Sequence, residues 1–230
     1  MPIRAIFFDV GETLIDETRL LHGWADTMGV DRAEFLAVLD DVIAKGENYR
    51  LIFERLRPGF DVRAAAAERK RSGTDFKIEA RDLYADARPC LSELTQDGWF
   101  VGIAGNQPPT AKAALESFGL AARLITTSAE LGVDKPSQDF FRKTLAKTRA
   151  ETRAEALPMS DFDPAEVLYV GDRLDNDVIP ARDFGMKTAL LERGPWGRNH
   201  VRWPDATLAD FVLKDLAGLP ALLREMKRES

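Results

Sequence analysis

The chain has 230 residues, enough for one well-packed domain or for a domain that carries a smaller insertion. Hydrophobic residues make up 45% of the chain and charged residues 30%, which is typical of an ordinary soluble globular protein. The net charge of −6 argues against nucleic acid or an anionic membrane surface as a partner.

Cysteine usage and the length of apolar runs bear on the compartment. Cys90 is the single cysteine of the sequence, so it can form neither an intramolecular disulfide nor a cysteine-based metal site. The apolar run near the start is broken at Asp9 and Glu12, before any cleavage site typical of a secretory signal. No apolar run reaches the roughly 18 residues needed to span a bilayer. We therefore expect a cytoplasmic protein with no membrane segment.

The first residue that bears on chemistry, Asp9, follows a short apolar run. Ile6, Phe7 and Phe8 are typical of a strand buried on both faces, and the run stops at Asp9. In parallel α/β sheets, ligands bind beyond the carboxyl ends of the strands. Asp9 is therefore predicted to enter a binding crevice, although a carboxylate at this place can also do no more than end the strand.

Residues 16–83 are predicted to form helices and no strand. Apolar residues recur at helical spacing over 20–28, 35–43, 52–56 and 62–71, and each run ends near a glycine. These helices follow the first predicted strand directly. We expect them to form a lid next to Asp9 that excludes water from the crevice.

From residue 84 onward, predicted strands and helices alternate. Strands are expected over 99–104, 124–126, 167–170, 188–191 and 211–213. This alternation is typical of a mostly parallel sheet covered on both faces. The predicted fold is therefore α/β, with a Rossmann-like three-layer core of residues 1–15 and 84–230 and an inserted α-helical cap of residues 16–83.

Three local features of this second part are predicted in detail. Pro136 is expected to be the first residue of a helix that ends at about Lys147, because a helix start does not use the N–H that proline lacks. Residues 149–165, with two prolines, are predicted to be an irregular connection. Residues 193–197 are predicted to be a loop in which Trp196 packs structurally rather than reaching the crevice.

Polar or glycine residues at four places share one position in the predicted fold, at the carboxyl end of a strand or the start of a helix. They are Asp9, Gly105-Asn106, Lys135, and Asp172 with Asp177. Carboxylate oxygens favour a hard cation such as Mg²⁺, which typically takes one or two protein carboxylates together with water and phosphate. A lysine can neutralise the remaining negative charge. The set predicts a Mg²⁺ site that handles an anionic substrate.

The same places carry four motifs that resemble those of the haloacid dehalogenase superfamily of hydrolases. In the family's order, the motifs are FFDVGETL, IAGNQ, GVDKPSQDFF and VLYVGDRLDNDVIPARDFGM. The resemblance covers the whole chain, core and helical cap alike. It implies a hydrolase that acts on a small molecule, most simply a phosphorylated metabolite, with Mg²⁺ as cofactor.

The resemblance also implies a role for each matched residue. Asp9 would be the nucleophile, forming an aspartyl-phosphate in a phosphatase or an ester in a dehalogenase. Lys135 would hold Asp9 and the transferring group. Asp172 would be the main second carboxylate on Mg²⁺, Asp177 would be a supporting ligand or outer partner, and Gly11 would supply its backbone carbonyl to the metal.

Two positions depart from the family pattern. Family phosphatases carry a second aspartate two residues after the nucleophile, where it protonates the leaving oxygen and then activates water, but this chain has Gly11. Such general acid–base catalysis is typically worth about 10² to 10⁴ in rate. The family also places Ser or Thr before the asparagine of the second motif to hold a phosphate oxygen. Here Gly105 precedes Asn106, which leaves only backbone N–H groups for that task. The resemblance implies that Gly105, Asn106 and Lys135 bind the substrate.

Three functions remain open on the sequence. One is a Mg²⁺-dependent phosphatase in which Glu12, Asp16 or a good leaving group covers for the missing acid. The second is a metal-independent 2-haloacid-type dehalogenase, a branch that also lacks the second aspartate but carries a nearby aromatic residue that Gly11 does not supply. The third is a protein that binds a phosphorylated ligand with little or no turnover. The retained Asp172 and Asp177 favour the first.

Substrate choice is expected to depend on the lid. Arg19, His22 and Trp24 lie nearest to Asp9 along the predicted lid helices, although Trp24 is on the apolar stripe and is expected mainly in the core. The chain's two histidines are His22 and His200, so a histidine-based zinc site is not expected.

Overall fold

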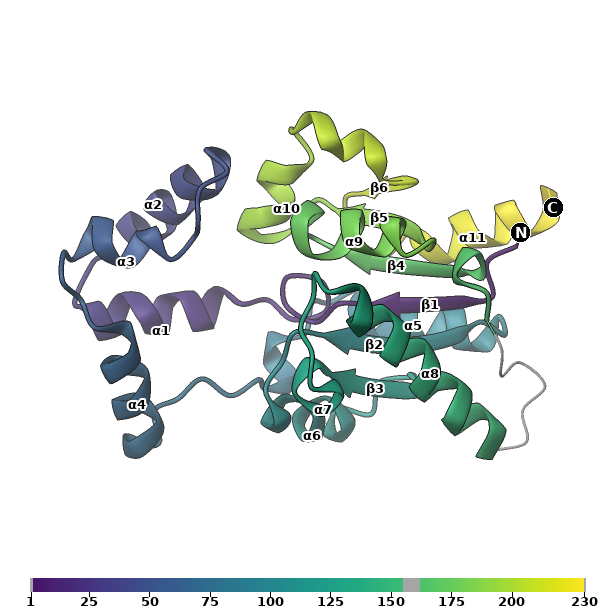
Figure 1. Cartoon of the computed structure of the whole chain (residues 1–230), viewed down its shortest axis with the longest axis horizontal. Coiled ribbons are helices and arrows are strands. Elements are labelled where there is room, and N and C mark those ends of the chain that lie inside the picture. Colours follow the sequence, from purple (N-terminus) through teal and green to yellow (C-terminus); the bar gives the residue numbers. More distant parts are fainter. Residues whose placement is uncertain (1, 155–161, 230) are drawn as a thin grey trace.

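A computed structural model describes residues 2–154 and 162–229 (Figure 1). In this part of the chain one six-stranded sheet has the order β3-β2-β1-β4-β5-β6, and every neighbouring pair is parallel. The strands are β1 (Ala5–Phe8), β2 (Phe100–Gly105), β3 (Leu124–Thr127), β4 (Val167–Gly171), β5 (Lys187–Leu191) and β6 (Phe211–Leu213). The predicted parallel α/β sheet is confirmed.

The register of the central strands decides where the polar residues meet. In β1, Phe8 lies opposite Ile103 of β2 and Val170 of β4. Parallel strands end at the same edge, so the residues that follow β1, β2 and β4 lie close together. In Figure 1 the arrowheads of these strands point toward the helices that follow β1, which places those helices over this edge.

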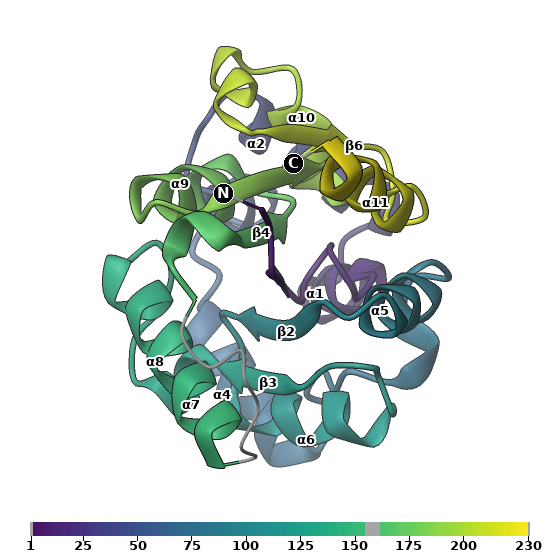
Figure 2. The same cartoon turned by 90° about the vertical axis from the view of Figure 1, so that its right-hand side faces the viewer.

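Helices cover both faces of the sheet. They are α5 (Ala87–Gln96), α6 (Pro109–Ser117), α7 (Ser128–Leu131), α8 (Gln138–Ala154), α9 (Ile179–Asp183), α10 (Gly194–His200) and α11 (Leu219–Glu229). Side chains alternate along a strand, so Ile6 and Phe8 of β1 pack into one core with α5 and α11. Ala5 and Phe7 pack on the opposite face with α8. Figure 2 shows these two helical layers on either side of the sheet.

Four helices between β1 and β2 lie apart from the sheet. They are α1 (Thr18–Met28), α2 (Arg32–Ala44), α3 (Leu51–Leu56) and α4 (Val62–Ser72). Their apolar faces pack on one another around Phe35, Leu39 and Ile52, in a cluster separate from the two cores of the sheet. Residues 16–83, all of which the structure describes, contain no strand, as predicted. We call residues 18–72 the helical segment.

Helix α8 has different bounds from those predicted from the sequence. Helix α8 begins at Gln138, not at Pro136, because a turn in which Ser137 N–H bonds to the Asp134 carbonyl precedes it. The helix continues to Ala154 and does not end near Lys147. The hydroxyls of Thr148 and Thr152 each donate to the carbonyl four residues back, which lets these polar residues stay buried on the helix. Of the irregular connection predicted over 149–165, residues 155–161 lie outside the described residues.

The predicted loop at 193–197 is also wrong, because most of it belongs to helix α10. Pro195 lies in the first turn, where its missing N–H costs nothing, and the side-chain amide of Asn199 donates to the Pro195 carbonyl at 2.9 Å. Gly194 starts the helix with a left-handed φ of 63°. Within the described chain, no helix combines the length and apolar character needed to cross a membrane.

Close packing of β2 on β1 gives a test of this core. A Cβ at Gly102 would lie 2.3 Å from the Phe7 ring, whereas nothing lies within 4 Å of a Cβ at Gly218. We expect Gly102→Ala to lower the free energy of unfolding by about 1 to 3 kcal/mol through overpacking. Gly218→Ala should change it by less than about 0.5 kcal/mol. Urea denaturation measures both, and equal stabilities of the two variants would contradict this packing.

Candidate active site

Lys135 joins two of the predicted site residues. Its ammonium group donates to Asp9 Oδ1 at 2.7 Å and to Asp177 Oδ1 at 2.5 Å. Asp9 follows β1, Lys135 lies between α7 and α8, and Asp177 lies in a π-helical turn, Leu174–Val178, that follows β4. Three separated parts of the chain therefore meet through one fully buried cation.

Asn106, which follows β2, fixes the backbone of Lys135. Its side-chain amide donates to the Lys135 carbonyl at 2.9 Å, and its carbonyl oxygen accepts from the Lys135 N–H at 2.8 Å. Both ends of the amide are thus engaged with the backbone of Lys135. Asn106 therefore positions Lys135, and the expectation that Asn106 also binds substrate stays a prediction.

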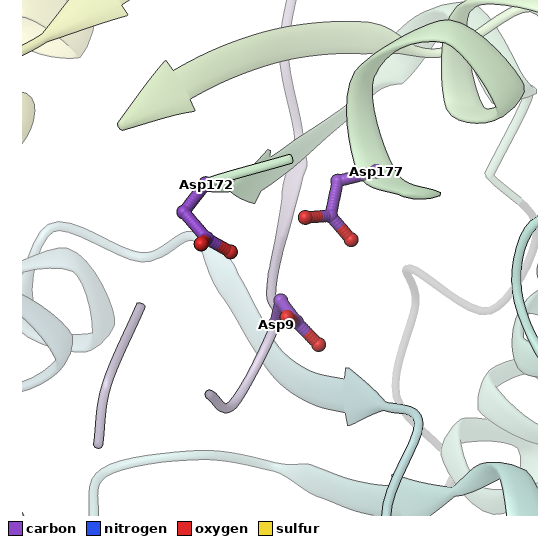
Figure 3. A group of neighbouring side chains, drawn as sticks. All are labelled: Asp9, Asp172 and Asp177. Carbon is purple, nitrogen blue, oxygen red and sulfur yellow. The ribbon is translucent and has the colours of Figure 1, made fainter. Parts of the chain in front are cut away.

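Asp9, Asp172 and Asp177 form an acidic cluster. Each offers a carboxylate oxygen, and these atoms lie within 4.8 Å of one another. Figure 3 shows the three carboxyl groups directed toward a shared space. Asp172 Oδ2 is buried and has no hydrogen-bond partner among the described residues. A hard divalent cation would supply that missing partner, so the donor set fits the Mg²⁺ predicted from the sequence.

Burial and mutual repulsion shape the charges of this cluster. Burial raises the pKa of Asp172 well above its usual value, and the nearby carboxylates of Asp177 and Asp9 raise it further. Burial also raises the pKa of Asp177 to about 6, although Lys135 opposes this shift. Burial alone would lower the pKa of Lys135, but the carboxylates of Asp177 and Asp9 outweigh it and raise that pKa well above its usual value. The lysine therefore stays charged.

The two glycines that depart from the family pattern both lie against carboxyl groups. A Cβ at Gly105 would lie 2.5 Å from Asp9 Oδ1 and 3.0 Å from Val10 Cγ2. A Cβ at Gly11 would lie 2.5 Å from Glu17 Oε1. Gly105 therefore leaves room for the observed orientation of Asp9, and Gly11 leaves room for the carboxyl group of Glu17.

Two further carboxyl groups, those of Glu12 and Glu17, line the same cavity as Asp9. Glu12 is buried, has a left-handed φ of 50°, and accepts a hydrogen bond from the Tyr84 hydroxyl at 2.5 Å. Burial raises the pKa of Glu12 to about 7. Burial, followed by the nearby carboxylates of Glu12 and Asp9, raises the pKa of Glu17 to about 8.

A cavity of about 420 Å³ opens above these residues. Its polar lining comes from the strand ends and the residues that follow them: Asp9, Gly11, Glu12, Glu17, Asn106, Gln107, Asp172, Arg173 and Asn176. Its apolar lining comes mostly from the helical segment: Leu20, Leu21, Trp24, Phe35, Leu39, Tyr49, Ile52, Phe53 and Trp196. The site is therefore a polar floor beneath largely apolar walls.

The structure corrects several expectations about the lining. Arg19 and His22, predicted to be nearest to the crevice, line a different pocket together with Asp16. Arg19 is held there by Asp82, at 2.6 Å. Trp24 does reach the cavity, and it also packs on Phe53 with a ring-centroid distance of 5.2 Å.

Trp196 reaches the cavity too, contrary to the prediction that it packs elsewhere. Its ring lies 5.8 Å from that of Tyr49 and 5.1 Å from the Arg173 guanidinium. It thus connects α10 with the helical segment.

Two residues that line the cavity, Glu17 and Arg173, were not predicted from the sequence. Glu17 lies shortly before the helix predicted over 20–28, and this place near a helix start is the one signal that could have drawn attention to it.

Comparison with known families places this site in context. The family model for haloacid dehalogenase-like hydrolases matches residues 3–185, which include Asp9, Lys135 and both later aspartates. The chain belongs to this hydrolase family.

Several known proteins are similar to this chain along most of their length. A glyceraldehyde 3-phosphate phosphatase of Methanocaldococcus jannaschii is 30% identical, over 99% of this chain and 100% of that protein. The corresponding phosphatase of Pyrococcus furiosus is 26% identical over 99% and 95%. The L-2-haloacid dehalogenase of Xanthobacter autotrophicus is 21% identical, with a TM-score of 0.60 over 97% and 99% of the two chains. At that identity, the dehalogenase shows a shared fold.

Removal of the buried cation tests the electrostatic arrangement. We expect Lys135→Met to lower the free energy of unfolding by about 3 to 5 kcal/mol at pH 7, because it leaves buried carboxylates without their counter-charge. The loss should shrink as the pH falls and the carboxyls become protonated. Lys112→Met, which breaks an ion pair to Glu130 at a 29% exposed lysine, should cost less than about 1 kcal/mol. Denaturant unfolding at pH 5 and pH 7 measures the difference, and similar losses in both variants would contradict this arrangement.

Proposed function

We propose that this family member is a Mg²⁺-dependent phosphatase of a small phosphorylated metabolite, with Asp9 as its nucleophile. The observation that carries the proposal is the contact of Asp9 with the buried Lys135, next to an Asp172 oxygen without a hydrogen-bond partner among the described residues. The similarity to phosphatases over nearly the whole chain supports it. In this proposal residues 16–83 act as a cap domain over a core of residues 1–15 and 84–230.

The chemistry follows from the position of Asp9. Because Lys135 holds Oδ1, Oδ2 is the oxygen that attacks phosphorus. As the new P–O bond to Asp9 forms, the bond from phosphorus to the leaving oxygen breaks. Water then attacks phosphorus, which releases inorganic phosphate and restores the carboxylate. Lys135 keeps its charge throughout and offsets the negative charge of the phosphoryl group.

Asp9 and Asp172 would hold the metal ion, and Asp177 would support it. Both oxygens of Asp177 are already bonded, Oδ1 to Lys135 and Oδ2 to the Arg173 N–H at 3.0 Å. Asp177 therefore serves best as an outer partner that fixes Lys135. Mg²⁺ bound here would shield the attacking carboxylate from the negative charge of the phosphoryl group.

The other two functions open on the sequence have less support. A metal-independent dehalogenase would leave Asp172 Oδ2 without a cation to compensate its burial beside two further carboxyl groups. A ligand-binding protein without turnover was suggested by Gly11 and Gly105. Both glycines have a packing reason here, because each makes room for a carboxyl group in or beside the cavity.

Replacement of the nucleophile tests the proposed function. We expect Asp9→Asn to lower Mg²⁺-dependent release of inorganic phosphate by at least about 10³-fold, because an amide oxygen is a poor nucleophile. Glyceraldehyde 3-phosphate and other small phosphorylated metabolites serve as substrates, each with Mg²⁺ and with chelator. Asp16→Asn, which alters a carboxyl group in a different pocket, should keep activity within about 2-fold. Full activity of Asp9→Asn, or halide release from a 2-haloacid without metal, would overturn the proposal.

Binding of the metal can be measured separately from turnover. We expect Mg²⁺ at one hundred times its Kd to stabilise the protein by about 2.7 kcal/mol. Asp172→Asn should abolish this effect, because it removes a charged ligand. Asp139→Asn, at a carboxylate paired with Arg142 on the surface, should leave the effect intact. Thermal unfolding with and without Mg²⁺ gives the comparison, and equal Mg²⁺ effects in the two variants would argue against the site.

A further inference from the structure

The place of the missing aspartate at position 11 is filled by another carboxyl group. A Cβ at Gly11 would lie 2.5 Å from Glu17 Oε1, 2.8 Å from Glu17 Cδ and 3.2 Å from Glu17 Oε2. A side chain at position 11 would therefore project into the space that the Glu17 carboxyl group occupies. The chain has no carboxyl group at position 11. The carboxyl group of Glu17, six positions later, occupies the space that a side chain at position 11 would enter.

The local structure around Glu17 leaves this carboxyl group free to act. Glu17 is the residue directly before helix α1, where a side chain commonly caps the helix, yet its side chain makes no capping hydrogen bond. Within residues 2–154 and 162–229, no hydrogen bond or ion pair to its carboxyl group is formed. Glu17 lines the same cavity as Asp9 and Asp172. The carboxyl group is thus directed into the cavity and has no structural partner that would hold it back.

The two other carboxyl groups near Gly11 are less well placed. Glu12 Oε2 accepts the hydrogen bond from Tyr84 and lies 2.6 Å from where a Cβ of Gly194 would be, so that oxygen is enclosed. Asp16 Oδ1 accepts the Thr18 N–H at 2.8 Å, and Asp16 lines a different pocket. Outside the two chain neighbours of Gly11, the three atoms nearest to a Cβ there all belong to the Glu17 carboxyl group.

We propose that Glu17 is the catalytic acid and base of this enzyme, supplied from the start of the first cap helix in place of a residue at position 11. The inference rests on the proposed phosphatase function. In the first half of the reaction, the Glu17 carboxyl group gives its proton to the leaving oxygen as the bond from phosphorus to that oxygen breaks. In the second half, the Glu17 carboxylate takes a proton from water as the water oxygen bonds to phosphorus and the Asp9–phosphorus linkage breaks.

Glu17→Gln separates this role from a structural one, because the amide keeps the shape of the side chain but cannot transfer the proton. With an alkyl phosphate, whose leaving oxygen needs protonation, kcat should fall by about 10² to 10⁴. With p-nitrophenyl phosphate, whose leaving group needs no proton, the first half should remain fast. The variant should then release a burst of one nitrophenolate per enzyme before slow turnover, because water is no longer activated.

A second test restores a carboxyl group at position 11 after the one at position 17 has been removed. Glu17→Ala empties the space beside Gly11, and Gly11→Asp in that background places a carboxyl group there again. We expect the double variant to turn over the alkyl phosphate at least about 10-fold faster than Glu17→Ala alone. A merely structural role of Glu17 would not be rescued by an aspartate at a different position.

The outcomes distinguish this inference from the proposed function. If Glu17→Gln turns over the alkyl phosphate at the wild-type rate, Glu17 is not the acid and base, whereas the phosphatase function stands. If Glu12→Gln in place of Glu17→Gln shows the loss and the burst, Glu12 holds the role and the proposal for Glu17 is overturned. If wild-type enzyme hydrolyses neither substrate with Mg²⁺ present, the phosphatase function fails and the inference fails with it.

Discussion

The ammonium group of Lys135 lies between the carboxylates of Asp9 and Asp177, and all three are almost completely removed from water. Removing charges from water is costly, so the arrangement persists only because each charge has a close partner of opposite sign and further hydrogen bonds. Asn106 supplies two of these bonds to the Lys135 backbone, and the Arg173 N–H supplies one to Asp177. The remaining acidic group, Asp172, has no such partner for its Oδ2. Lys135 thus compensates the charges of Asp9 and Asp177, whereas Asp172 Oδ2 is left to interact with a cation.

The parallel sheet makes this concentration of charge achievable. β1 lies between β2 and β4, so the residues after these strands reach the same edge although they are far apart in the sequence. β1 and β4 are hydrogen-bonded to each other and packed on both faces. This packing holds Asp9 and Asp172 close together although their carboxylates repel each other. The helical segment then closes the cavity with apolar side chains, whose low polarity strengthens the interactions on the polar floor.

The sequence was sufficient to predict the elements that depend on local patterns of apolar residues. The apolar runs of β1 and β4 identified the strands and the carboxylates behind them, and the helical periodicity of residues 20–71 identified the helical segment. Contacts between residues far apart in the sequence could not be predicted in this way. Arg19 was expected at the crevice, but it is bound by Asp82, 63 residues away, in a different pocket.

Glu17 shows the same limit more sharply. The sequence marks Gly11 as the loss of a carboxyl group, because a motif compares residues at fixed spacing. Only the fold shows that the chain between Gly11 and α1 returns, so that the Glu17 carboxyl group occupies the space beside Gly11. Helix α10 is a related case. Residues rich in Gly and Pro indicate a loop, whereas the backbone bond from the Gly197 N–H to the Arg193 carbonyl at 3.1 Å shows a helical turn.

We propose above that Asp9 attacks phosphorus beside a Mg²⁺ ion. A crystal structure of the protein with Mg²⁺ and beryllofluoride, a mimic of a phosphoryl group, would show this arrangement. We expect beryllium bonded to an Asp9 carboxylate oxygen, Lys135 within hydrogen-bond distance of the mimic or of Asp9, and Mg²⁺ on Asp9 and Asp172. Beryllofluoride bound elsewhere, or bound at Asp9 with no metal on Asp172, would contradict it.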